Sequence, residues 1–164
     1  MYLNSDLITL AAKVGKSLLA QGKMLAVAES CTGGWVAKVI TDVSGSSDWF
    51  EEGFVTYSNR AKQERLGVCA ETLDRHGAVS EAAVAEMARG ALQTADADAS
   101  LAVSGIAGPN GGTADKPVGT VWFGWAARRD SDVTVRTECR QFEGDREAIR
   151  RQAVEVALRG LLDG

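Results

Sequence analysis

Two potential nucleophiles, Ser30 and Cys31, stand side by side in residues 28–34 (AESCTGG). The apolar run at residues 24–28 predicts a buried strand, and residues 35–40 (WVAKVI) continue well as a helix. A strand that turns into a helix places its turn at the carboxyl edge of a sheet, where unpaired helical N–H groups can hold an anion or a developing oxyanion. The two glycines of the segment would let a ligand approach the backbone closely. We therefore predict the active site at this turn.

The serine and the cysteine differ in what each needs to attack a carbonyl. Ser30 could equally be the N-cap of the following helix, so its residue type leaves cap and nucleophile open. Cys31 at a helix amino end would have a lowered pKa, but cysteine nucleophiles usually work with a histidine, and the chain has only His76. A Cys31/His76 hydrolase remains an alternative, beside the simpler interpretation of Cys31 as a small buried residue.

Tyr57 and Lys62 are the candidates for activating the serine. Tyr57 lies near the end of a run of strand-like residues at 53–58, and Lys62 lies about one turn into an expected helix at 59–66. If that strand lies beside the first one, both side chains could reach Ser30. A lysine acts as a general base only when neutral, so burial or a neighbouring cation must lower its pKa well below the free value of ~10.4. The alternative is a solvated lysine on a helix face.

The chain has one glycine-dense loop, at residues 104–112 (SGIAGPNGG). Glycines leave backbone N–H groups free to converge on a phosphate, which makes Ser104, Gly105 and Gly108 candidates for substrate binding. The loop matches neither the P-loop nor the dinucleotide-binding fingerprint. It could equally be a flexible surface connection, to which Lys116 would add charge.

Two arginines, Arg146 and Arg150, are four residues apart at the start of the last expected helix and so share a face. A guanidinium can bind a phosphate through two hydrogen bonds. Both could instead be solvated and paired with Asp145 and Glu147.

Helices alternate with strands in the first part of the chain, and a hairpin follows. Helices are expected at residues 5–21, 35–40, 59–66, 81–92 and 145–162, and strands at 24–28, 53–58, 100–103, 120–127 and 133–142. Residues 71–79 are expected to be a connection. This order predicts a single α/β domain over residues 1–164, a three-layer α/β/α sandwich with a mixed, mostly parallel sheet.

Composition restricts the partners. The chain has 164 residues and a net charge of −4, which argues against a broad nucleic-acid or membrane surface. Three cysteines without a C-x-x-C pair suit a reduced, cytoplasmic setting, and a single histidine leaves little for a metal site. Trp49 and Phe50, taken as exposed near the pocket, make a homo-oligomer plausible.

Five segments together resemble the CinA carboxy-terminal domain family, whose stand-alone members include bacterial nicotinamide-mononucleotide deamidases. They are residues 28–34 (AESCTGG), 53–59 (GFVTYSN), 77–81 (GAVSE), 104–109 (SGIAGP) and 116–121 (KPVGTV). The resemblance runs from about residue 5 to residue 162. It implies the same α/β/α fold and hydrolysis of nicotinamide mononucleotide to nicotinic acid mononucleotide and ammonia, a step in pyridine nucleotide salvage. Some relatives carry a further amino-terminal domain, whose activity is not expected here.

The resemblance also implies a serine amidohydrolase that uses no metal or other cofactor. Ser30 matches the nucleophile, and Lys62 and Tyr57 match its supporting positions. Joined to the analysis of the residues, it predicts an oxyanion held by N–H groups around Thr32 and Gly33, with Glu29 orienting the lysine or the ribose. The substrate-binding residues expected are Glu29, Cys31, Thr32, Gly33, Ser104, Gly105, Gly108 and Arg146. The alternative outside enzymes is a regulatory module that binds the nucleotide without reacting.

Overall fold

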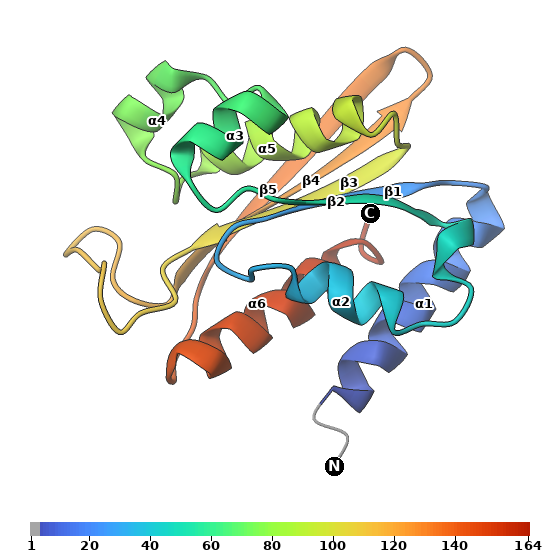
Figure 1. Ribbon diagram of the computed structural model, residues 1–164, viewed down its shortest axis with the longest axis horizontal. Coiled ribbons are helices and arrows are strands. Elements are labelled where there is room, and N and C mark those ends of the chain that lie inside the picture. The colour runs from blue at the N-terminus through green and yellow to red at the C-terminus, as the bar shows by residue number, and fades with distance from the viewer. Residues whose placement is uncertain (1–3) are drawn as a thin grey trace.

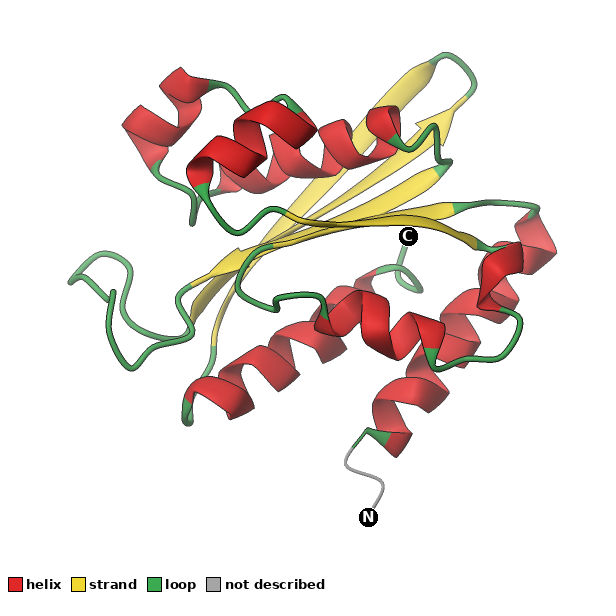
Figure 2. Cartoon of the chain, in the orientation of Figure 1, coloured by secondary structure: helices red, strands yellow, loops and turns green. Residues whose placement is uncertain are grey.

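A five-stranded mixed sheet forms the middle layer of the computed structural model, which describes residues 4–164 (Figure 2). Its strands are β1 (Leu25–Glu29), β2 (Phe50–Val55), β3 (Ala99–Gly105), β4 (Thr120–Arg129) and β5 (Asp132–Gln141). In the order β2-β1-β3-β4-β5, β1 pairs in parallel with β2 and β3, while β4 is antiparallel to β3 and β5. The carboxyl ends of three neighbouring parallel strands therefore meet at one edge.

Helices cover both faces of this sheet, which confirms the three-layer prediction (Figure 1). On one face lie α1 (Ser5–Gln21), α2 (Trp35–Thr41) and α6 (Arg146–Gly160). On the other lie α3 (Asn59–Leu66), α4 (Ala70–His76) and α5 (Glu81–Thr94), and a short 3₁₀ turn, η1 (Ser46–Asp48), precedes β2. No helix of residues 4–164 is both long and apolar enough to cross a membrane.

The central strand β1 is buried along its whole length, as expected of a parallel strand covered on both faces. Its side chains alternate between two hydrophobic clusters. Leu25 and Val27 pack with α1, α2 and α6, and Ala26 and Ala28 pack with α5. The strand therefore fixes its last residue, Glu29, and the Ser30 turn between the two helical layers.

Trp49 is buried, which corrects the expectation that it is exposed near the pocket. Only 1% of its surface is accessible. Its ring fills the space over Gly15 of α1, where an added Cβ would come within 2.5 Å of the ring. The tryptophan therefore joins η1 to α1 in the core and gives no support to a homo-oligomer.

Two further details differ from the sequence prediction. Residues 71–76 of the expected connection belong to the helix α4, which has only Leu73 as a buried residue and so lacks an apolar periodicity. Strand β2 ends at Val55, so Tyr57 lies beyond the strand. The helix α3 begins at Asn59, as expected, and its cap is Ser58, whose hydroxyl accepts a hydrogen bond from the Ala61 N–H at 3.1 Å.

Candidate active site

Ser30 lies directly after β1, at the edge where the parallel strands end. Its backbone N–H donates to the Val103 carbonyl of β3 at 3.0 Å, which continues the sheet by one bond and fixes the position of the residue. The side chain is 8% exposed and faces a pocket of about 220 Å³. Residues from five segments line this pocket: Ser30, Cys31, Tyr57, Lys62, Ala78, Val79, Ser104, Gly105, Ala107 and Arg146.

Lys62 reaches Ser30 from the first turn of α3, on the other face of the sheet. Its Nζ lies 2.9 Å from Ser30 Oγ, 2.7 Å from the Thr56 carbonyl oxygen and 3.2 Å from the Tyr57 carbonyl oxygen. Only 1% of the residue is exposed. No carboxylate is among these partners, and burial lowers the lysine pKa from 10.5 to about 8.

The three neighbours of Nζ determine where its lone pair points. A neutral amine has two N–H groups and one lone pair. The carbonyls of Thr56 and Tyr57 can only accept hydrogen bonds, so they take the two N–H groups. The lone pair is then left to accept the hydroxyl proton of Ser30. The arrangement suits a general base for this hydroxyl whenever the lysine is neutral.

Glu29 does not line the pocket, contrary to the expectation that it contacts the lysine or the ribose. Its carboxylate is buried and accepts hydrogen bonds from the Val36 N–H at 2.9 Å and the Ala37 N–H at 3.0 Å. It therefore caps the first turn of α2, where no side chain of the preceding residue does so. A carboxylate in this position is stabilised by the helix dipole.

The amino end of α2 consequently has little left to offer an anion. Besides the two N–H groups held by Glu29, the Trp35 N–H donates to the Thr32 carbonyl, and the Gly33 N–H donates to the Ser30 carbonyl at 3.0 Å. The prediction that the Gly33 N–H receives an oxyanion is therefore wrong in this geometry. Within residues 4–164, the N–H groups of Cys31 and Thr32 make no hydrogen bond. They remain as candidate oxyanion donors.

Thr32 and Gly33 do not line the pocket that contains Ser30. They lie instead around a neighbouring hollow of about 280 Å³, which Arg150 of α6 shares. This arginine donates from Nε to the Cys31 carbonyl at 3.0 Å and from Nη2 to the Thr32 carbonyl at 3.1 Å. Arg150 is thus directed at the backbone beside the nucleophile, which the sequence spacing did not indicate.

Cys31 and His76 do not form a nucleophile–base pair. Cys31 lines the pocket, but burial, followed by the nearby charge of Glu29, raises its pKa to about 11. His76 is exposed at the end of α4 and is not among the pocket residues. A neutral thiol without a base argues against the cysteine alternative.

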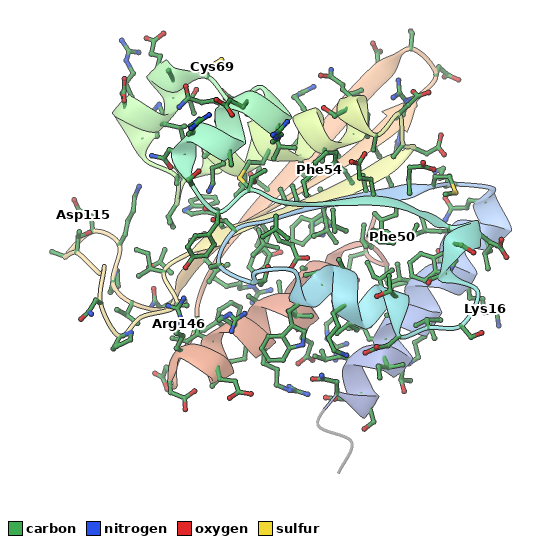
Figure 3. The ribbon with its side chains drawn as sticks, in the orientation of Figure 1. Lys16, Phe50, Phe54, Cys69, Asp115 and Arg146 are labelled. Carbon is green, nitrogen blue, oxygen red and sulfur yellow. The ribbon has the colours of Figure 1, made fainter. Side chains whose placement is uncertain are left out.

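Arg146 and Tyr57 form the open side of the pocket. Tyr57 is 62% exposed, and its hydroxyl accepts a hydrogen bond from Arg146 Nη2 at 3.2 Å. Nη1 of the same arginine donates to the Gly108 carbonyl at 2.7 Å. Figure 3 shows Arg146 at the start of α6, facing the base of the long loop that has Asp115 near its tip. The side chain of Tyr57 makes no hydrogen bond to Ser30 or Lys62. The backbone carbonyl of Tyr57 contacts the lysine instead.

The glycine-rich loop contributes through its first residues. Ser104 and Gly105 line the pocket, whereas Gly108 acts through its bond to Arg146. Farther along, Lys116 Nζ donates to the His76 carbonyl at 2.6 Å, which ties the loop to the turn after α4. That turn supplies Ala78 and Val79, two pocket residues within a recognised motif to which the sequence assigned no role.

No cluster of three or more His, Cys, Asp or Glu side chains suited to a metal ion occurs within residues 4–164. The donors that do converge are a hydroxyl, an amine, a guanidinium and backbone groups. These are groups that bind and hydrolyse an organic anion rather than ligands for a divalent cation.

A family model and two named relatives match nearly the whole chain. The family model described as "CinA C-terminal domain" matches residues 7–163. An Escherichia coli K12 protein named nicotinamide-nucleotide amidohydrolase PncC is 59% identical over 158 residues, which cover 96% of this chain and 94% of that protein. A Pseudomonas putida protein of the same name is 51% identical over 154 residues, with 94% of each chain covered.

Solved structures show the same likeness. The crystal structure of the competence damage-inducible protein A (ComA) from Klebsiella pneumoniae superposes with a TM-score of 0.90 at 43% identity, covering 96% of this chain and 95% of that one. The competence/damage inducible protein CihA from Agrobacterium tumefaciens superposes with a TM-score of 0.90 at 42% identity, covering 97% and 95%.

Proposed function

This chain belongs to the CinA C-terminal domain family, and on that premise we propose that it is a nicotinamide-nucleotide amidohydrolase. The reaction is hydrolysis of the carboxamide of nicotinamide mononucleotide to nicotinic acid mononucleotide and ammonia. Relatives of matching length that are 51–59% identical have the corresponding name. The observation that carries the proposal is the 2.9 Å contact between Ser30 Oγ and a buried lysine with a lowered pKa, at the wall of a pocket.

In the first half of the reaction, Ser30 Oγ attacks the carboxamide carbon while neutral Lys62 takes the hydroxyl proton. The C–O bond forms and the carbonyl π electrons move to oxygen, where the N–H groups of Cys31 and Thr32 are the candidate donors. Each such donor typically contributes ~10²–10³ in turnover. The Lys62 ammonium then gives its proton to the amide nitrogen, the C–N bond breaks, and ammonia leaves an acyl-serine ester.

In the second half, water replaces ammonia. Lys62 has returned to its neutral form and takes a proton from the water as the water attacks the ester carbon. Collapse of the second tetrahedral intermediate breaks the bond to Ser30 Oγ, which recovers its proton from the lysine. The products are the free serine and the carboxylic acid of nicotinic acid mononucleotide. This acid ionises and releases its proton to the solvent, where the ammonia can take it up, so protons and atoms balance without a cofactor.

The phosphate of the nucleotide is assigned to Arg146 and the loop that begins at Ser104. Arg146 borders the pocket and is held in place by Gly108 and Tyr57 through one bond each. Exchange of the 3.2 Å bond to Tyr57 for a phosphate oxygen would replace a neutral acceptor with a charged one. This residue would then distinguish the nucleotide from free nicotinamide.

The proposal includes a cytoplasmic location, which the three free cysteines support. A homo-oligomer stays a prediction, for which the exposed hydrophobic residues Val55 and Tyr57 are the relevant surface residues. Light scattering of the purified protein measures the oligomeric state directly.

The decisive experiment is an ammonia assay with nicotinamide mononucleotide, the dinucleotide and free nicotinamide side by side. We expect release from the mononucleotide, loss of that release in Ser30→Ala, and retention of most of it in Cys31→Ser. The opposite pattern in the two variants would move the nucleophile to Cys31. Thermal stabilisation by the mononucleotide without any ammonia would instead identify a regulatory nucleotide-binding module.

A further inference from the structure

Arg150 lies in the second turn of α6, where its side chain contacts the backbone that follows the nucleophile. Its two hydrogen bonds go to consecutive carbonyls, those of Cys31 and Thr32, at 3.0 and 3.1 Å. Its guanidinium carbon is 5.5 Å from the centre of the Trp35 ring, at the start of α2. One side chain of α6 thus holds the whole turn between β1 and α2.

These bonds fix the orientation of a peptide group. In a trans peptide the C=O and the following N–H point in opposite directions, and the bond between Cys31 and Thr32 is trans. Since Arg150 holds the Cys31 oxygen on the side of α6, the Thr32 N–H must point away from α6. That N–H has no hydrogen-bond partner within residues 4–164. Thr32 is fully buried, and a buried donor without a partner is energetically costly. The oxygen of a tetrahedral intermediate formed on Ser30 would satisfy this N–H, whereas rotation of the peptide would turn it away.

The neighbouring glycine is consistent with the same contact. Gly33 has a φ of +60°, and a Cβ at this position would lie 3.3 Å from Arg150 Nη2. A larger residue would be strained in the left-handed region and would also press on the guanidinium. The glycine thus lets the arginine approach the backbone closely.

Arg150 does not have the surroundings of a phosphate ligand, although it shares a helix face with Arg146. Its Nε and Nη2 atoms are both engaged with carbonyls, and it borders the hollow with Thr32 and Gly33 rather than the pocket with Ser30. The two arginines therefore have separate tasks, one toward the ligand and one toward the turn.

We propose that Arg150 is a positioning residue, which sets the peptide between Cys31 and Thr32 so that its N–H can stabilise the oxyanion formed when Ser30 attacks. The proposal rests on the proposed function insofar as it takes Ser30 as the nucleophile. It assigns to Arg150 no contact with the substrate.

The test replaces Arg150 by Met and by Lys, with Arg151→Met as the matched control. Arg151 is on the same helix but pairs with Asp6 and Glu155, so the control loses the same charge without touching the turn. In Arg150→Met we expect kcat to fall about 10- to 100-fold, less than the full loss of a donor, with KM within threefold. Arg150→Lys should lie between, because one ammonium cannot reproduce two parallel bonds. The control should stay within twofold.

A KM raised tenfold or more with kcat retained would overturn the proposal in favour of phosphate binding, and an unchanged kcat would overturn it outright. If the Met variant does not fold, as judged by its melting curve, the Lys variant decides on the same criteria. Nucleotide binding by Ser30→Ala and by Ser30→Ala/Arg150→Lys should be equal within threefold, and a tenfold loss in the double variant would also refute the positioning role.

A second readout does not depend on the natural substrate. An aryl sulfonyl fluoride should label Ser30 of the wild-type protein, followed by intact mass, and labelling should slow at least fivefold in Arg150→Met but not in Arg151→Met. Labelling that depends on Arg150, without ammonia release by the wild type, would sink the proposed function and keep this inference. Ammonia release by the wild type, with labelling that does not depend on Arg150, would support the proposed function and refute this inference. A wild-type protein that shows neither reaction would overturn both.

Discussion

The two sides of the pocket are built differently. On the nucleophile side, Lys62 is buried and its Nζ has three partners, two of them backbone carbonyls that cannot move independently of the sheet and α3. On the open side, Tyr57 is exposed, and Arg146 is held by one carbonyl and one phenol. The first arrangement favours a fixed geometry with a shifted pKa, and the second leaves a charged group free to exchange partners. The difference teaches that chemistry and ligand selection can be altered separately here.

The largest expected effect comes from the buried side. Lys62→Met removes the base, so kcat for ammonia release should fall about 10³- to 10⁴-fold while KM changes little. Lys62→Arg is the control for charge, and it should be as inactive because a guanidinium cannot become neutral. Retention of more than a tenth of kcat in either variant would contradict the role of the lysine.

Burial of this lysine should also be visible in stability. Its pKa is about 8 in the folded protein and 10.5 in the unfolded chain, so between these values the unfolded state binds more protons. The free energy of unfolding of the wild type should therefore rise, relative to Lys62→Met, by about 3 kcal/mol between pH 8 and pH 10.5. Urea unfolding of both proteins at pH 7.5 and 10.5 measures the difference. A difference that does not change with pH would mean that the lysine is not desolvated.

The open side should show the contrasting signature. Arg146→Ala is expected to raise KM for the mononucleotide about 10- to 100-fold, the range of a lost charge-assisted bond, with kcat within threefold. Steady-state kinetics on two variants separate the two contributions of the guanidinium. Arg146→Ala removes the charge, whereas Arg146→Lys keeps the charge but removes the paired N–H donors. An unchanged KM in the alanine variant would refute the phosphate assignment.

The pH profile tests the state of the base in the intact enzyme. At pH 7 about a tenth of a lysine with a pKa near 8 is neutral, and at pH 9 about nine-tenths is. We expect kcat/KM to rise about tenfold from pH 7 to pH 9, with an apparent pKa about 8. Cys31→Ser should leave the profile unchanged, whereas a profile that shifts in this variant would point to the thiol.

The smallest effect is expected at the loop. Lys116→Met removes the bond to the His76 carbonyl and so loosens the turn that supplies Ala78 and Val79. KM should rise about two- to fivefold with kcat nearly unchanged, by the loss of one exposed charge-assisted bond. Lys116→Arg, which can still reach a carbonyl, should recover most of the loss. A fall in kcat without a change in KM would place this contact on the nucleophile side instead.

Much of the fold followed from local signals in the sequence. The strand and helix on either side of Ser30 and the helices expected at residues 5–21, 59–66 and 81–92 are where the sequence places them. Left-handed Gly22 and Gly67 end two of these helices, and Ser80 caps the start of α5. These features depend on hydrophobic periodicity and backbone preferences within a few residues. The helix α4 was missed because Leu73 is its only buried residue.

The sequence by itself determined the family, the layered fold and part of the pocket, including Ser30, Lys62 and Arg146, since motifs and periodicity are properties of the chain. Only the tertiary structure decided what those residues do. The Glu29 carboxylate accepts hydrogen bonds from the first turn of α2. Burial lowers the pKa of Lys62, which contacts Ser30 although it is 32 residues away in the sequence. Arg150 holds the Cys31 carbonyl, 119 residues away. The roles of Lys62 and Arg150 depend on desolvation and on hydrogen bonds between distant segments, and that of Glu29 depends on how the turn brings its carboxylate to the start of α2. Residue spacing alone encodes none of these.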